Sequence, residues 1–173
     1  GMENYRQLFS PDTELGRWLA TRNTMLRIGR NLFVHAGLSA RLLERDLEMD
    51  TLNARMSEGL YRTSKERRED PTLEFLYRSA GPVWYRGMVC TDEKYDPLTP
   101  EQTDALLRRY DADRLLIGHT IFPDISTFHD GRVIAVNVQN ERNRRKNRGR
   151  AVLIEGSRIS VVGNRGVKRV LEE

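Results

Sequence analysis

Cysteine is almost absent from this chain of 173 residues. Cys90 is the one thiol in the sequence, so no disulfide can form within a single chain and a disulfide framework is excluded. A chain with so little cysteine is typical of a reducing compartment, and we expect a cytoplasmic location.

Long apolar runs are missing as well. A membrane helix needs about 20 consecutive apolar residues, and no segment of the chain approaches that length, while 31% of the residues are charged. We therefore predict no membrane span. Gly1 before Met2 resembles the remnant of a cleaved tag, and we expect residues 2–173 to form a single domain.

Histidine is also scarce, yet two of the three histidines stand in the same setting. His35 directly follows the apolar run 32–34, and His119 follows the apolar run 115–117 and one glycine. Short apolar runs beside glycines predict buried strands, and open α/β sheets bind ligands beyond the carboxyl ends of their strands. Imidazole is the commonest metal ligand. We expect the two rings to share one site; the alternative is that each hydrogen-bonds only its own loop.

The remaining pattern predicts an α/β fold with strands mostly in hairpins and two or three flanking helices. A capping box at Thr99 and Gln102 predicts the start of one helix. The polar tail after Gly163 is expected to fray, and the basic segment 140–149 is expected to be a flexible loop. A docking helix is predicted over residues 13–19, and the flanking helices are predicted over residues 40–61, 72–78 and 100–110. The predicted hairpins cover residues 24–34, 125–138 and 150–162.

Three short motifs occur in a fixed order along the chain. Residues 33–38 spell FVHAGL, residues 81–86 spell GPVWYR, and residues 117–120 spell IGHT. They resemble the FVHAGL, GPLWYR and GHT motifs of the calcineurin-like metallophosphoesterases, in particular the phosphoprotein phosphatase branch and its bacterial Shewanella-like relatives. The resemblance extends over about residues 5 to 165.

The resemblance implies the C-terminal half of a calcineurin-like αββα sandwich, with a dinuclear metal centre between strand ends. It implies that His35 and His119 bind the second divalent metal ion (Mn, Fe or Zn) and that Arg86 binds the substrate phosphate. Paired metal ions suit phosphoester hydrolysis, because they activate water and stabilise charge on the phosphate oxygens. Ile121 stands where other branches have a second histidine, which favours a serine/threonine-phosphatase-like enzyme.

The motifs that open such enzymes are absent from this sequence. GDxHG, GDxxDRG and GNHE supply the first metal site, the bridging aspartate, an asparagine ligand and the catalytic histidine of the family. We therefore expect no catalytic residue in this chain, an incomplete or empty metal site, and little phosphatase activity from the chain alone. The expected partners are a missing N-terminal half and a phosphorylated substrate, either a protein, a nucleotide or a small phosphoester.

Two other functions remain open. The basic cluster at residues 142–150 favours a non-catalytic module that binds nucleic acid or a protein partner, although no aromatic residue interrupts it for base stacking. A half sandwich would also leave exposed strand edges, which favours a homo-oligomer or a domain swap.

Overall fold

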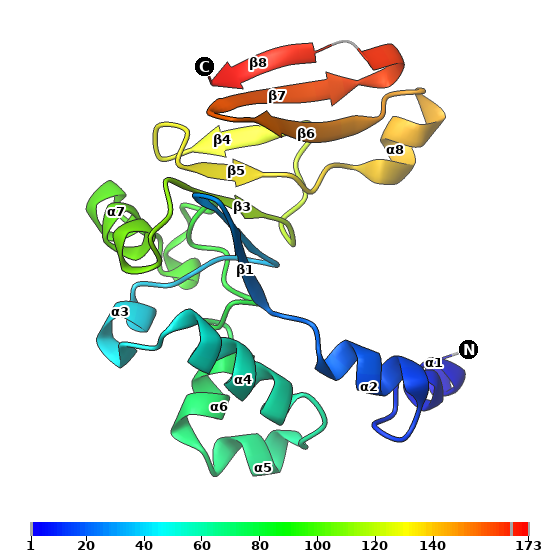
Figure 1. Cartoon of the computed structure of the whole chain (residues 1–173), viewed down its shortest axis with the longest axis vertical. Helices are drawn as coiled ribbons and strands as arrows, with labels where there is room; N and C mark the ends of the chain where they lie inside the picture. The colour runs from blue at the N-terminus through cyan, green and yellow to red at the C-terminus, as the bar shows by residue number, and fades with distance from the viewer. Residues whose placement is uncertain (1, 167, 173) are drawn as a thin grey trace.

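The computed structural model describes residues 2–166 and 168–172, which form an α/β fold in layers (Figure 1). A mixed five-stranded sheet has the order β1-β2-β3-β5-β4, and a second, antiparallel sheet has the order β6-β7-β8. The strands are β1 (Met25–Ile28), β2 (Asn31–Val34), β3 (Arg114–Ile117), β4 (Ser126–Phe128), β5 (Val133–Ala135), β6 (Arg150–Glu155), β7 (Arg158–Gly163) and β8 (Lys168–Glu172).

Most of the helices lie on the side of the larger sheet that faces away from the smaller one, while α1 and α2 reach away from the body (Figure 1). Among the described residues, no helix is long and apolar enough to span a bilayer. The helices are α1 (Met2–Leu8), α2 (Glu14–Ala20), α3 (Arg41–Arg45), α4 (Met49–Gly59), α5 (Ser64–Arg68), α6 (Pro71–Tyr77), α7 (Pro100–Arg109) and α8 (Asn140–Arg145), with the short 3-10 turns η1 (Glu93–Tyr95) and η2 (Asn164–Gly166).

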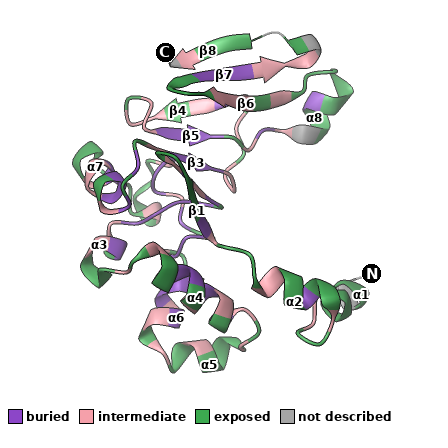
Figure 2. Ribbon diagram, viewed as in Figure 1, coloured by how far each residue is buried: buried purple, intermediate pink, exposed green. Residues whose placement is uncertain are grey.

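The central strands are apolar on both faces because each face meets a different layer. In β3, Leu115 and Ile117 belong to the core beneath the helices, whereas Leu116 belongs to the core shared with the three-stranded sheet. Successive side chains of a strand point to opposite faces, so a continuous apolar run fills both cores. Figure 2 shows the resulting buried band along β3 and β5.

Parallel pairing of β2 with β3 sets the level at which the two strands end. Val34 is the register partner of Ile117, so His35 and Gly118 are the next residues along the two strands. The Gly118 N–H donates a hydrogen bond of 2.8 Å to the His35 carbonyl, which extends the ladder by one step. Both histidine-bearing loops therefore leave the sheet at the same edge.

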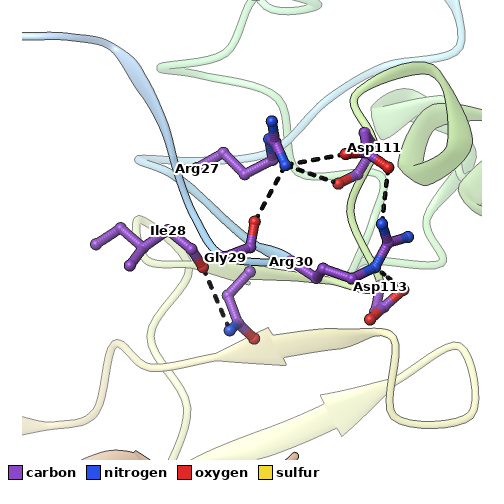
Figure 3. A network of polar contacts seen from close by, with 7 residues as sticks. Arg27, Ile28, Gly29, Arg30, Asp111 and Asp113 are labelled. Carbon is purple, nitrogen blue, oxygen red and sulfur yellow. Dashed lines mark hydrogen bonds and ion pairs between the residues drawn. The ribbon is translucent and has the colours of Figure 1, made fainter. Parts of the chain in front are cut away.

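A polar network fixes the opposite end of these strands (Figure 3). Arg30 donates to Asp111 and Asp113, each at 2.7 Å, and Arg27 donates to Asp111 at 3.0 Å. The Asp113 N–H donates to the Arg30 carbonyl at 2.8 Å. These exposed pairs contribute little stability individually, but together they hold the β1–β2 turn against the start of β3.

Comparison with the sequence predictions confirms the α/β class and many of the local elements. The three predicted hairpins are present, and α7 begins at the predicted Thr99 capping box. The helix predicted over residues 40–61 is wrong as a continuous element, because Asp46 adopts a left-handed conformation (φ 47°) between α3 and α4.

The C-terminal region contains more regular structure than the sequence predicts. Strand β8 pairs with β7 in the tail that was expected to fray, because the edge of β7 offers backbone hydrogen bonds to it. Part of the basic segment 140–149 is the helix α8, in which Arg145 pairs with Glu141 one turn earlier. The prediction of a flexible loop over residues 140–149 is therefore wrong for the part that forms α8.

Candidate functional site

His35 and His119 meet at the edge where β2 and β3 end. His35 Nε2 lies 3.1 Å from His119 Nδ1, and the ring centroids are 5.0 Å apart at an interplanar angle of 61°. Residues 84 positions apart in the sequence are thus in direct contact. Without a bound cation, one ring donates its N–H to the unprotonated nitrogen of the other.

The backbone at His119 has an unusual conformation. Its φ is +59°, in the left-handed region that residues with a Cβ seldom adopt. The Thr120 N–H donates to the Gly118 carbonyl at 2.6 Å, so a tight turn encloses the residue. This turn directs the His119 ring back toward His35 rather than along the strand. Strained conformations of this kind concentrate at functional sites.

The segment with residues 81–86 supplies the other side of the site. The Pro82 carbonyl accepts a hydrogen bond from the Ala36 N–H at 2.9 Å, which anchors this loop beside His35. The Trp84 ring meets His119 edge to face at 5.5 Å, and Arg86 Nη1 donates to Thr120 Oγ1 at 2.9 Å. The three sequence motifs therefore converge in space.

Trp84 and Tyr85 have different environments. Trp84 is 55% exposed, so it forms a wall of the site, whereas Tyr85 is buried in the core. The Tyr85 hydroxyl donates to the Asp96 carbonyl at 2.5 Å. A Cβ at Gly87 would lie 2.2 Å from that hydroxyl oxygen, so only glycine allows this close approach.

The electrostatics of the site favour a neutral His119. Burial lowers the pKa of this imidazole below its ordinary 6.5, and the positive charge of Arg86 and the neighbouring His35 lower the pKa further. His119 Nε2 is buried and has no hydrogen-bond partner among the described residues. A neutral ring keeps a lone pair available for a cation at neutral pH.

The donor set fits part of a metal site. Two ligands at right angles on a metal with bonds of about 2.1 Å lie about 3.0 Å apart, close to the separation of the two ring nitrogens. Within the described residues, however, no group of three or more histidine, cysteine or carboxylate side chains gathers around a common point. The pair can therefore supply two ligands, and the other ligands must come from elsewhere.

His129, which the turn sequence marks as an exposed residue without a site role, has a structural role. It is partly buried; its Nε2 lies 3.0 Å from the Met88 carbonyl and its Nδ1 lies 3.3 Å from Thr103 Oγ1. The sulfur of Met88 in turn accepts from the Leu38 N–H at 3.3 Å. His129 thus supports the loop after His35, and nothing in the local sequence signals these distant partners.

A groove of about 920 Å³ opens beside the site. Trp84 and Arg86 line it, and the same two residues contact His119 and Thr120. Its size falls in the range of ligand-binding clefts. Its other walls come from α3, the end of α6 and the segment around η1.

Comparisons with known proteins identify phosphatases as structural neighbours. One solved cold-active protein tyrosine phosphatase superposes with a TM-score of 0.85 and 29% identity, over 96% of this chain and 47% of that chain. A cold-active protein-tyrosine phosphatase of a psychrophilic Shewanella sp. and a point mutant of such an enzyme give TM-scores of 0.85, 28% identity, and coverage of 96% of this chain and 48% of theirs. No protein-family model matches the sequence, and no curated protein matches it.

The likeness supports a phosphatase-type α/β fold for the chain. The chain spans about half the length of the solved structures that it matches. The comparisons do not test the roles of His35, His119 and Arg86, which stay predictions.

The left-handed backbone at His119 leads to a stability prediction. His119→Gly and His119→Ala both remove the imidazole, but only glycine adopts φ +59° without strain. We expect His119→Ala to have a free energy of unfolding about 1 kcal/mol lower than His119→Gly, measured by urea denaturation. At exposed Lys65 in α5, the alanine variant should instead be more stable than the glycine variant, because alanine is the better helix former. Equal stabilities of His119→Ala and His119→Gly would contradict backbone strain at position 119.

The lowered pKa of His119 leads to a pH prediction. Between the folded pKa and the ordinary value of 6.5, the unfolded chain binds a proton that the folded chain does not, so stability rises with pH there and levels off above about 6.5. In His119→Asn this contribution disappears, so the wild type should gain stability relative to the variant from pH 5 to pH 7. Urea unfolding in EDTA measures the difference. If the difference in unfolding free energy between the wild type and His119→Asn stays constant or shrinks as the pH rises, the lowered pKa of His119 is contradicted.

Proposed function

We propose that this chain is the C-terminal half of a calcineurin-like metallophosphoesterase and that it supplies part of a dinuclear site for the hydrolysis of phosphate monoesters. The observation that carries the proposal is the 3.1 Å separation of His35 Nε2 and His119 Nδ1 at adjacent strand ends. The sequence motifs are the basis for the family, and the phosphatase neighbours support phosphoester hydrolysis in general.

His35 and His119 would hold one divalent metal ion through one nitrogen each. When bound, such an ion supplies Lewis-acid stabilisation of phosphate oxygens and lowers the pKa of a bound water. His119 stays neutral at physiological pH because of its burial and the nearby Arg86 charge, so it needs no deprotonation before it binds a cation. Trp84 fixes the plane of the His119 ring from the side.

Arg86 would orient the substrate phosphate. Its guanidinium is held beside His119 by the hydrogen bond to Thr120, and no carboxylate among the described side chains neutralises it. A planar guanidinium binds two phosphate oxygens at once. The structural neighbours are named protein tyrosine phosphatases, which favours a phosphotyrosine protein over the phosphoserine or phosphothreonine that the missing second histidine suggested. Exposed Trp84 offers an apolar wall for an aromatic ring.

The remaining ligands and the catalytic histidine would come from the other half of the enzyme. Beside His35, an apolar hollow of about 590 Å³ is lined by Leu26, Phe33, Val136 and Val152. Leu26 and the neighbouring Ile28 are 44% and 60% exposed on the edge strand β1. We place the missing half against this face, where it would cover the apolar side chains and reach the two histidines. A homo-oligomer through the same edge is the alternative partner.

The alternative of a nucleic-acid-binding module has no observation in its favour. Within the basic segment 142–150, Arg145 pairs with Glu141 and Arg150 pairs with Asp124 at 2.8 Å. Two of its six cations therefore already have carboxylate partners.

Metal binding by the histidine pair is the direct test. In a two-dimensional ¹H–¹⁵N spectrum of the three histidine rings, added Mn²⁺ should broaden the signals of His35 and His119 more strongly than those of His129, because paramagnetic broadening falls steeply with distance from the ion. His129 is the internal control, because its ring nitrogens already contact Thr103 and Met88. His35→Ala should weaken Mn²⁺ binding at least tenfold. Equal broadening of all three rings, or none, would contradict the metal role.

The chain alone should hydrolyse phosphoesters poorly. Two imidazoles hold a metal ion weakly, and the described residues offer no third ligand beside them. With p-nitrophenyl phosphate and Mn²⁺ we expect turnover close to that of the buffer. Robust turnover that His35→Ala abolishes would show that the chain carries a complete catalytic site and would overturn the half-enzyme assignment.

A further inference from the structure

We infer that the groove beside Arg86 binds an acidic peptide segment next to the phosphorylated residue of a protein substrate. The inference rests on the proposed function, since it assigns the groove to the substrate of the same site. Trp84 and Arg86 belong both to the groove and to the surroundings of His119 and Thr120. A peptide whose phosphate contacts Arg86 would therefore continue into the groove.

The charge of the groove selects for an anion. Arg41, Arg78, Arg86 and Lys94 line it, against the single carboxylate of Asp96. These four cations come from four different segments: the first residue of α3, the residue after α6, the loop after residue 81, and η1. Only the tertiary fold brings them together, so the positive charge is a property of the groove and not of a basic run in the sequence.

Most of this charge is available to a ligand. Among the residues that the structure describes, Arg41 and Arg86 pair with no carboxylate, and Arg78 has only a long contact of 3.7 Å with Glu74. Lys94 is the exception, with Asp92 at 2.9 Å. Arg41 and Arg78 are both exposed at the rim, so they can reach side chains of a bound segment.

The walls of the groove are held in place by internal bonds. Tyr85 ties the segment after η1 to the loop that carries Arg86 through its hydrogen bond to the Asp96 carbonyl. Tyr77 donates to the Met56 carbonyl, and the Arg67 guanidinium lies 3.9 Å from the centre of its ring. A preformed groove loses little entropy on binding, and the cationic rim adds attraction for acidic side chains.

A peptide fits these features better than a small anion does. The cations come from four separate segments, and the groove of about 920 Å³ that they line is much larger than a single phosphate or carboxylate needs. Glutamate or aspartate side chains at several positions of an extended chain match such a distribution. The phosphatase neighbours are also named for protein substrates.

The experiment compares two fluorescein-labelled phosphotyrosine peptides in EDTA at low salt. One carries glutamates on both sides of the phosphotyrosine, and the other carries glutamines at the same positions. By fluorescence anisotropy, the wild-type chain should bind the glutamate peptide roughly five to ten times more tightly. The double variant Arg41→Glu with Arg78→Glu should lose this preference and keep its affinity for the glutamine peptide within about twofold.

A matched charge reversal controls for net charge. Arg68→Glu with Arg144→Glu changes the chain by the same amount at exposed positions on α5 and α8, away from the groove lining. This variant should keep the glutamate preference. Circular dichroism checks that both variants fold.

Three results would overturn the inference: no preference in the wild type, a preference that survives the groove reversal, or an equal loss in the control variant. Competition by ATP as strong as that by the glutamate peptide would assign the groove to nucleotides and would likewise overturn it. The proposed function is judged separately by Mn²⁺ broadening of His35 and His119. A different result is that the wild type prefers the glutamate peptide and only the groove variant loses that preference, while Mn²⁺ broadens neither His35 nor His119. That result would support peptide binding in the groove and contradict the metal role of the two histidines.

Discussion

The parallel hydrogen bonding of β2 to β3 is the constraint on which the candidate site depends. It pairs Val34 with Ile117, so the two histidines follow at one edge although they are 84 positions apart in the sequence. A slip of one residue would send every side chain of a strand to the other face. Leu32 and Val34 of β2 and residues 115–117 of β3 are buried, so such a slip would move core side chains out of the core. The register is therefore what sets the distance between the imidazoles.

A second constraint is the loop that follows α6, because it determines the electrostatic character of the site. Hydrogen bonds from Ala36 to Pro82 and from Tyr85 to Asp96 attach this loop to the end of β2 and to the segment around η1. As a result, Arg86 stands beside His119, where its charge adds to the effect of burial in lowering the pKa of the imidazole. The imidazoles of His35 and His119, next to the guanidinium group of Arg86, suit a cation and a phosphate bound side by side.

The elements that the sequence predicted well are those with local physical causes. The start of α7 follows from the capping box of Thr99 and Gln102, and the hairpins follow from short turns between apolar runs. The break at Asp46 and the pairing of β8 were missed. The break separates α3, which packs against α7, from α4, which packs against α6, and the pairing of β8 depends on the edge of β7. His129 was misjudged for a similar reason: its partners, Met88 and Thr103, are 41 and 26 positions away.

Local sequence patterns are enough to establish the α/β class, the strand ends that carry His35 and His119, and the order of three motifs that resemble a phosphatase family. These features depend on patterns within a few residues. The tertiary structure alone decided that the two rings lie 3.1 Å apart, that Trp84 is exposed while Tyr85 is buried, and that four cations from separate segments line one groove. Such facts depend on register and on packing between distant segments, which no local pattern encodes.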